Sequence, residues 1–287
     1  MASATPAYRA FATSCHAKPV KIGLLTDIHH ADSNPKGTRY YRESLGKVKE
    51  AVGQFRAAKV NTLIQMGDLI DSGQRSTKEM ELGFLREAIT ELRQTGRPTF
   101  GLLGNHCLSR LSKNEVIEEL GQKSTFMSLN VDHWKIIMLD ACFRDDGLPY
   151  NAGNYQWTES DIPQYQREWL ANQLSVCDRR TIVFCHQRLD LDKSDPYAVT
   201  SSAAVRKILA DSKKVAAVFM GHSHTNNLNV IDGIPYITQK AVVEGSGEEN
   251  NAYSILELHR SGQIKLTGFR KVEDHPFAVA TRDVGTK

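Results

Sequence analysis

The sequence lacks a membrane-spanning segment and a recognisable secretory signal. No apolar run reaches the roughly 18 residues that a membrane-crossing helix needs. The first twenty residues contain Arg9 and Lys18 but no continuous apolar core, so they do not have the pattern of a signal peptide. We therefore expect no membrane partner and a cytoplasmic location, or a periplasmic or secreted one if a signal peptide has been removed.

The sequence also lacks paired cysteines. Its five cysteines form no CxxC motif, and an odd number leaves at least one of them without a partner. A chain of this length rarely depends on a disulfide framework. We predict that most of them are buried thiols: Cys15, Cys107, Cys142, Cys177 and Cys185.

A strong excess of charge of one sign is missing as well. The chain has 36 basic and 33 acidic residues, a net charge of +3, which argues against a dedicated nucleic-acid surface. A small anionic substrate is still compatible, because a site can be locally positive in a nearly neutral protein. The length of 287 residues and the 40% apolar content fit one large globular domain. We place that domain at 20–275, between a weakly structured lead-in 1–19 and a tail 276–287.

Short apolar runs alternate with amphipathic patterns along the chain. This alternation predicts an α/β protein with right-handed crossovers and a largely parallel sheet. Strands are expected at 20–26, 60–66, 98–103, 134–140, 181–185 and 215–220, and again at 227–231, 234–238, 252–258 and 264–269. Helices are expected at 40–58, 77–95, 162–176 and 200–211, and a long loop at 142–161.

Polar residues of metal-binding types directly follow five of the expected strands. In chain order, the clusters are Asp27-x-His29, Gly67-Asp68, Gly104-Asn105-His106, His186 and Gly221-His222-x-His224. Each cluster alone is a weak signal, since a single His after a strand is usually a hydrogen-bonded structural residue. Ligands bind at the carboxyl ends of strands in α/β sheets, and five such ends are improbable as an accident of core packing. We therefore predict one shared site.

The donor types in these clusters indicate the chemistry of that site. Carboxylate, amide and imidazole groups together suit Mn, Fe or Zn better than a soft metal. Two ions about 3.5–4 Å apart need a bridging anion, which a single carboxylate can supply. Glycines beside Asp68, Asn105 and His222 are expected where the backbone turns tightly at a strand end. The sequence thus predicts a centre of two metal ions.

The ordered set of clusters spans residues 27–224 and resembles the calcineurin-like metallophosphoesterase superfamily. The resemblance implies a four-layer α-β-β-α sandwich, with two mixed sheets flanked by helices. It implies that one ion is held by Asp27, His29, Asp68 and His224. It implies that the other is held by Asp68, Asn105, His186 and His222, with Asp68 bridging. His106 would be the catalytic residue that faces the substrate and protonates the leaving oxygen.

Two positions leave alternatives open at this level. His30 follows His29 and offers a second imidazole, although the i, i+2 spacing from Asp27 favours His29. The superfamily usually has an acidic residue after the catalytic His, but Cys107 stands there. The acidic partner that orients His106 is therefore in doubt. Asp71 is interpreted as a structural residue that caps a helix or binds the loop.

Residues 37–45 (GTRYYRESL) carry a second, narrower resemblance. They are similar to a segment of the manganese-dependent ADP-ribose/CDP-alcohol diphosphatase group. Arg39 and Arg42 would bind a phosphate, and Tyr40 and Tyr41 would stack on a base or bind a phosphate oxygen. In the alternative, these residues simply begin a helix. Arg188 is a further candidate substrate contact, and Trp157 in the long loop is either a base-stacking residue or an anchor of that loop.

These observations favour a dimetal phosphohydrolase that acts on phosphodiester or phosphoanhydride bonds, with nucleotide-type substrates. The superfamily resemblance implies attack by a hydroxide that bridges the two ions. A phosphomonoesterase, acting on small molecules or on proteins, is the alternative within the hydrolases. A non-catalytic scaffold is the alternative outside them, but such a relative would be expected to have lost ligands, and all matching positions are intact.

Overall fold

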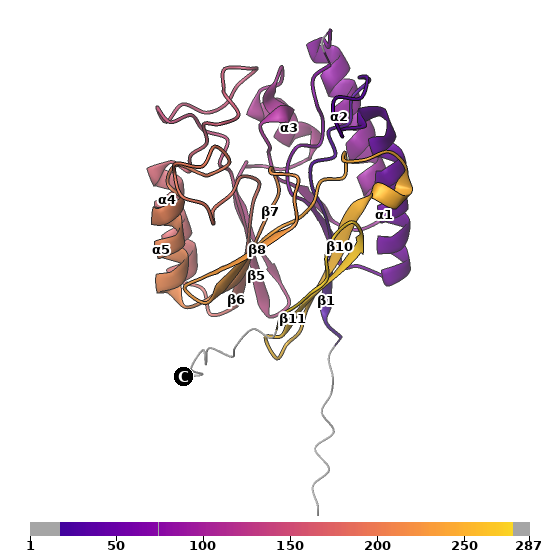
Figure 1. Cartoon of the computed structure of the whole chain (residues 1–287). Helices are drawn as coiled ribbons and strands as arrows, with labels where there is room; N and C mark the ends of the chain where they lie inside the picture. The colour runs from indigo at the N-terminus through magenta and orange to yellow at the C-terminus, as the bar shows by residue number, and fades with distance from the viewer. Residues whose placement is uncertain (1–17, 74, 278–287) are drawn as a thin grey trace, which may run out of the picture.

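A computed structural model describes residues 18–73 and 75–277 of the chain. This part folds into two six-stranded sheets packed face to face, with helices on both outer surfaces (Figure 1). The expected α-β-β-α sandwich is therefore confirmed. Most of the predicted lead-in 1–19 and most of the predicted tail 276–287 lie outside the described residues. Within the described part, no helix is both long and apolar enough to cross a membrane.

The first sheet has the strand order β12-β11-β10-β1-β2-β3. Its strands are β1 (Val20–Leu25), β2 (Thr62–Gln65), β3 (Thr99–Gly101), β10 (Ala252–Leu258), β11 (Ile264–Arg270) and β12 (His275–Phe277). β1, β2 and β3 run parallel, so their carboxyl ends lie at one edge of the sheet. β10, β11 and β12 extend the sheet in antiparallel pairs.

The second sheet has the strand order β4-β5-β6-β7-β9-β8. Its strands are β4 (Met127–Val131), β5 (Trp134–Leu139), β6 (Arg180–Cys185), β7 (Val215–Met220), β8 (Asn227–Ile231) and β9 (Ile234–Thr238). The inner strands are parallel, whereas β4 and β8 pair antiparallel at the edges. Asp232 and Gly233 join β8 to β9 with positive φ angles of 52° and 73°, as a tight hairpin turn requires. Hairpins without crossover helices make both sheets mixed rather than largely parallel.

Alternate side chains of each inner strand enter different layers of the core. Ile182 and Phe184 of β6 lie between the sheets, where they pack with Ile22 and Leu24 of β1. Val183 of β6 points the other way, into the layer beneath α4 and α5. This two-residue period fixes which face of the strand is covered by the helices.

The helices begin and end close to their expected bounds. They are α1 (Ser44–Ala58), α2 (Lys78–Arg93), α3 (Lys113–Glu119), α4 (Gln164–Ser175) and α5 (Ser202–Ser212), with 3₁₀ turns at Tyr41–Glu43, His106–Leu108 and Glu248–Asn250. α1 and α2 cover the first sheet and α4 and α5 the second (Figure 1). The sequence prediction missed α3, although Ser112 and Glu115 form a capping box at its start.

Candidate dimetal centre

The five polar clusters meet at one edge of the sandwich. Asp27, Asp68 and Asn105 follow β1, β2 and β3 of the first sheet, and His186 and His222 follow β6 and β7 of the second. Because these strands are parallel within each sheet and the sheets face each other, all five ends open into the same space. The seven side chains predicted to bind metal are at most 9% exposed. The predicted convergence of the clusters is therefore observed.

The backbone at the site adopts conformations that side chains rarely tolerate. Asp27, His29, Asp68, His222 and His224 have positive φ angles of 53°, 47°, 53°, 70° and 57°. Left-handed backbone at a non-glycine residue costs free energy and persists where the surrounding structure holds it. Backbone hydrogen bonds between the two strand-end segments hold this conformation. One of them is donated by the amide of His29 to the carbonyl oxygen of Asp68 at 2.9 Å. Local strain thus aims these side chains into one small volume.

Two glycines let the ligand side chains approach the backbone. At Gly104, a Cβ atom would lie 2.2 Å from Oδ1 of Asp68, which real Cβ atoms do not do. At Gly67, a Cβ atom would lie 2.2 Å from Nδ1 of His186, and the φ angle of 104° is itself unsuited to a side chain. Close approach, in addition to the tight turn expected from sequence, explains the glycines beside the ligands.

Three of the imidazoles are held from behind by oxygen acceptors. Nδ1 of His186 lies 2.8 Å from the carbonyl oxygen of Met66, and Nδ1 of His224 lies 2.6 Å from Oε1 of Glu244. Nδ1 of His29 lies 2.9 Å from Oδ2 of Asp71. A proton on Nδ1 leaves the lone pair on Nε2, which is the arrangement found in metal-ligating histidines. All three rings therefore present Nε2 to the centre.

The donor atoms lie close enough to one another to share metal ions. Asp27, His29 and His224 form one group within 4.8 Å, and Asp68, His186 and His222 form a second. Oδ2 of Asp68 lies 3.1 Å from Nε2 of His186 and 3.6 Å from Nε2 of His29, so it reaches both groups. Each group is part of one of the two ligand sets that the superfamily resemblance implies, and Asp68 is within reach of both. His106 also offers a ring nitrogen within 4.8 Å of His29 and Asp68.

Unpartnered polar atoms test whether the residues fit such ions. Among the described residues, four site atoms are buried without a hydrogen-bond partner: Oδ1 of Asp27, Oδ1 of Asn105, Nε2 of His186 and Nε2 of His222. A buried polar atom without a partner costs about 1–3 kcal/mol, so such atoms are rare unless something binds them. Their clustering fits two metal ions with oxygen and nitrogen ligands.

The electrostatics of the site point the same way. Burial alone would raise the pKa of Asp27, but His224 and His186 hold it well below its usual range. Burial would lower the pKa of His29, yet Asp27 and Asp71 raise it to about 10. Burial and the neighbouring His186 lower the pKa of His222 to about 3, so this ring stays neutral. The site therefore keeps ionised carboxylates and attracts positive charge to its centre.

His106 lies beside the centre and is oriented by Asp71. Nδ1 of His106 is 3.0 Å from Oδ1 of Asp71, while the other oxygen of the same carboxylate contacts His29. Cys107 points away, and its buried sulfur accepts a hydrogen bond from the amide of Leu69 at 3.3 Å. The acidic partner that the sequence left in doubt is thus Asp71. The interpretation of Asp71 as merely structural was incomplete, since it positions two imidazoles.

The structure also resolves the choice between the two adjacent histidines. Nε2 of His30 lies 2.7 Å from Oε2 of Glu87 on α2, and its ring packs edge-on against Phe84 at 5.5 Å. His30 therefore faces α2, whereas His29 faces the centre.

The four residues predicted to contact substrate have different surroundings. Arg39 is partly exposed and lines the cleft over the centre, with its Nε 3.8 Å from Glu244. Arg42 is paired with Asp32 at 2.5 Å and donates to Asn34 at 2.9 Å. Arg188 is buried and forms two hydrogen bonds of 2.6 Å with Asp190. Tyr40 is the N-cap of the 3₁₀ turn Tyr41–Glu43, and the neighbouring Tyr41 lines the pocket.

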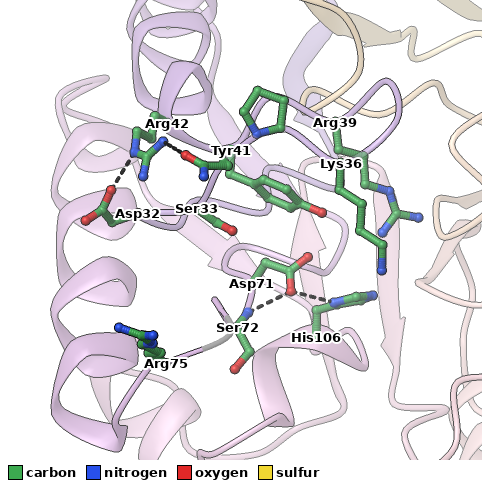
Figure 2. A pocket seen from close by; sticks show the side chains of 12 residues that line it. Asp32, Ser33, Lys36, Arg39, Tyr41, Arg42, Asp71, Ser72, Arg75 and His106 are labelled. Atoms are coloured by element: carbon green, nitrogen blue, oxygen red, sulfur yellow. Dashed lines mark hydrogen bonds and ion pairs between the residues drawn. The ribbon is translucent and has the colours of Figure 1, made fainter.

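A cationic pocket of about 820 Å³ adjoins the metal-ligand cluster (Figure 2). Lys36, Arg39, Arg42 and Arg75 line it, together with Tyr41, Asp71 and His106. Figure 2 shows Lys36 and Arg39 on the side of the pocket where His106 lies. A second cavity of about 630 Å³ lies directly over Asp68, Asn105 and His222, and it shares Lys36, Arg39 and His106 with the first.

Sequence reasoning missed several residues of this site. Asp71 stands three residues after Asp68, and its closeness in sequence to this strand-end cluster was a usable signal. Lys36 directly precedes the segment 37–45 but had no distinguishing pattern of its own. Tyr197 lies in an irregular segment after β6 and reaches the site only through the folded loop.

Comparison with known proteins adds an independent finding. The family model of calcineurin-like phosphoesterases matches residues 20–226. A manganese-dependent ADP-ribose/CDP-alcohol diphosphatase from Oryza sativa subsp. japonica is 23% identical over 300 residues, covering 88% of this chain and 92% of the relative. The protein of that name from Danio rerio is 21% identical over 312 residues, covering 88% and 96%. The crystal structure of a dimetal phosphatase from Danio rerio has the same fold, with a TM-score of 0.77 and 20% identity over 90% of this chain and 98% of that one.

Proposed function

The chain belongs to the calcineurin-like phosphoesterase family, and we propose that this metal-dependent phosphohydrolase cleaves the diphosphate bond of small nucleotide-type substrates. The Oryza sativa and Danio rerio relatives carry names for activity on ADP-ribose and CDP-alcohols, which contain such a bond. Their similarity along nearly nine tenths of this chain supports the same class of substrate here.

The seven predicted ligands would hold the two ions in two sets. Asp27, His29 and His224 would serve one ion and Asn105, His186 and His222 the other, with Asp68 shared. The unpartnered atoms of Asp27, Asn105, His186 and His222 support this division. When bound, two such cations supply charge neutralisation at the phosphate and lower the pKa of a coordinated water.

His106 would act on the leaving group. Its ring is 27% exposed on the wall of the cleft, and Asp71 fixes Nδ1, so Nε2 is the atom directed towards a bound phosphate. A proton on Nε2 can pass to the oxygen of the leaving group, so that this oxygen departs protonated rather than as an anion. Lys36 and Arg39 on the same wall would bind negative charge on the substrate.

The cationic pocket is the observation that carries the proposal. Among the described residues, Lys36 and Arg75 have no carboxylate within ion-pair distance, so the pocket keeps unneutralised positive charge. A monoester occupies the metal centre with its single phosphate and makes no use of a neighbouring cationic pocket. A diphosphate has a second phosphate that fits this position.

A substrate comparison with the manganese-loaded enzyme tests the proposal. We expect kcat/KM for ADP-ribose and CDP-choline to exceed that for p-nitrophenyl phosphate and cyclic AMP by at least about 100-fold, roughly the value of two charge-assisted hydrogen bonds. Preference for the monoester would overturn the proposal in favour of a phosphomonoesterase. Asp68→Ala serves as the inactive control.

A further inference from the structure

Two exposed aromatic side chains stand beside the centre. Trp157, in the loop 142–161, is 45% exposed, and Tyr197, in the segment between β6 and α5, is 36% exposed. Their ring centroids are 5.2 Å apart, and they lie 6.3 and 5.5 Å from the ring of His222. We call Trp157 and Tyr197 the aromatic pair. Rings that are open to water beside a polar centre offer a stacking surface for a flat ligand.

The aromatic pair does not anchor the loop 142–161. Tyr150 and Tyr155 perform that role, because they stack on each other at 4.6 Å and pack into the core beneath α3. The Tyr155 hydroxyl also lies 3.1 Å from Oγ of Ser109. Trp157 has only Tyr197 and His222 as aromatic neighbours among the described residues. Its exposure therefore points to contact with a ligand.

The aromatic pair and the cationic pocket lie next to different ligand groups of the centre. The pair contacts His222, a predicted ligand of the second ion. The cationic pocket begins at Asp71 and His106, and the His106 ring lies 4.6 Å from that of His29, a predicted ligand of the first ion. The cleft over the centre joins them, since Trp157 and Tyr197 line it together with Lys36, Arg39 and His106.

We propose that the positions of the aromatic pair and the cationic pocket fix the orientation in which the substrate binds. This proposal rests on the proposed function above. The base stacks on the aromatic pair, the phosphate attached to the nucleoside occupies the metal centre, and the second phosphate occupies the cationic pocket. His106 then lies at the oxygen that joins the two phosphates. In the reverse direction, the base would meet four cationic side chains and the second phosphate would meet two aromatic rings.

The direction decides which phosphorus is attacked. The oxygen of one water molecule forms a bond to the nucleoside phosphorus, and the bond from that phosphorus to the bridging oxygen breaks. The bridging oxygen keeps the electron pair, leaves with the second phosphate and receives a proton from His106. The water releases its proton to solvent, from which His106 is reprotonated. The products are a nucleoside monophosphate, which contains the water oxygen, and a second phosphomonoester.

Isotope incorporation tests this assignment. The full-length manganese-loaded chain is incubated with ADP-ribose and with CDP-choline in ¹⁸O-water, and the products are separated and weighed by mass spectrometry. We expect ¹⁸O in AMP and CMP and none in ribose 5-phosphate or phosphocholine. Label in the non-nucleoside product, or in both products, would overturn the direction while leaving diphosphate hydrolysis intact. No hydrolysis of either substrate would overturn the proposed function and this inference with it.

Variants at the two ends give a second, independent readout. Trp157→Ala should lower kcat/KM for ADP-ribose, relative to that for bis(p-nitrophenyl) phosphate, by roughly 10-fold, since base stacking is lost. Lys36→Gln combined with Arg75→Gln should lower the same ratio, because the small diester has no second phosphate. Tyr165→Ala and Lys49→Gln are the matched controls, an exposed aromatic and an exposed lysine elsewhere. An unchanged ratio in Trp157→Ala would contradict the proposal that the base stacks on the aromatic pair.

Discussion

The carboxylate of Asp71 and the ring of His106 are joined by a contact of 3.0 Å between Oδ1 and Nδ1. The amide of Ser72 also donates to Oδ1 of Asp71 at 2.6 Å, so the carboxylate is itself held in place. Burial alone would raise the pKa of Asp71, but hydrogen bonds from His106 and His29 hold it below its usual range. An ionised Asp71 therefore fixes the tautomer and the orientation of the general acid.

Asp71→Asn should reduce kcat by roughly 10–100-fold, the usual effect of removing the residue that orients a site imidazole. The loss should be larger for substrates with poor leaving groups, which need the proton from His106. In a His106→Ala background, the same substitution should have a clearly smaller effect. Equal effects in the two backgrounds would show that Asp71 does not act through His106. Asp178→Asn, at a fully solvent-facing carboxylate, is the control.

Asp68→Ala and His106→Ala should separate metal binding from catalysis. Asp68 is the carboxylate within reach of both ligand groups, so its removal should abolish binding of the metals together with turnover. His106→Ala should retain the metals and lose most activity, least for substrates with good leaving groups. Elemental analysis of the purified proteins measures the metal content directly. A metal-free His106→Ala protein would show that His106 is a ligand.

Gly104→Ala should disturb the site sterically, without removing any predicted metal ligand or catalytic group. The new Cβ would lie 2.2 Å from Oδ1 and 2.4 Å from the amide nitrogen of Asp68. We expect a loss of about 1–3 kcal/mol in the free energy of unfolding, with weakened metal binding. Gly53→Ala is the matched control, because Gly53 lies within α1 with open space around it, and this change should stabilise the chain by about 0.5–1 kcal/mol. Urea denaturation measures both values.

Lys47→Met should loosen the segment that carries Glu244. The buried ammonium of Lys47 donates to the carbonyl oxygens of Val242, Glu244 and Gly245 at 2.9, 3.0 and 2.5 Å. Removing it leaves these acceptors without a donor and should cost about 1–3 kcal/mol of unfolding free energy. Because Glu244 holds His224, the affinity for manganese should fall as well. Lys49→Met, exposed on the same helix, should change stability by less than about 0.5 kcal/mol. If Lys47→Met kept its affinity for manganese, the segment that carries Glu244 would not contribute to metal binding.

The sequence by itself determined most of the order of strands and helices, and it predicted the set of candidate metal ligands. Apolar runs that end in Asp, Asn or His are local patterns, and a parallel sheet brings their ends together whatever the rest of the chain does. The identities of Asp27, Asp68 and His186 as site residues follow from position along the chain. Edge strands such as β4 and β12 were missed because short edge strands depend on pairing partners and have little periodicity of their own.

Only the tertiary structure decided which side chains surround the ligands. Asp71, Glu244 and Met66 hold imidazoles from segments far apart in sequence, and such contacts leave no local pattern. Likewise, Arg42 and Arg188 look like phosphate-binding residues in the sequence, yet the fold pairs each with an acidic neighbour. The aromatic pair arises from two irregular segments that meet over His222. A site's ligands can be specified by strand ends, but the groups that orient them and receive the substrate depend on how separate loops pack in space.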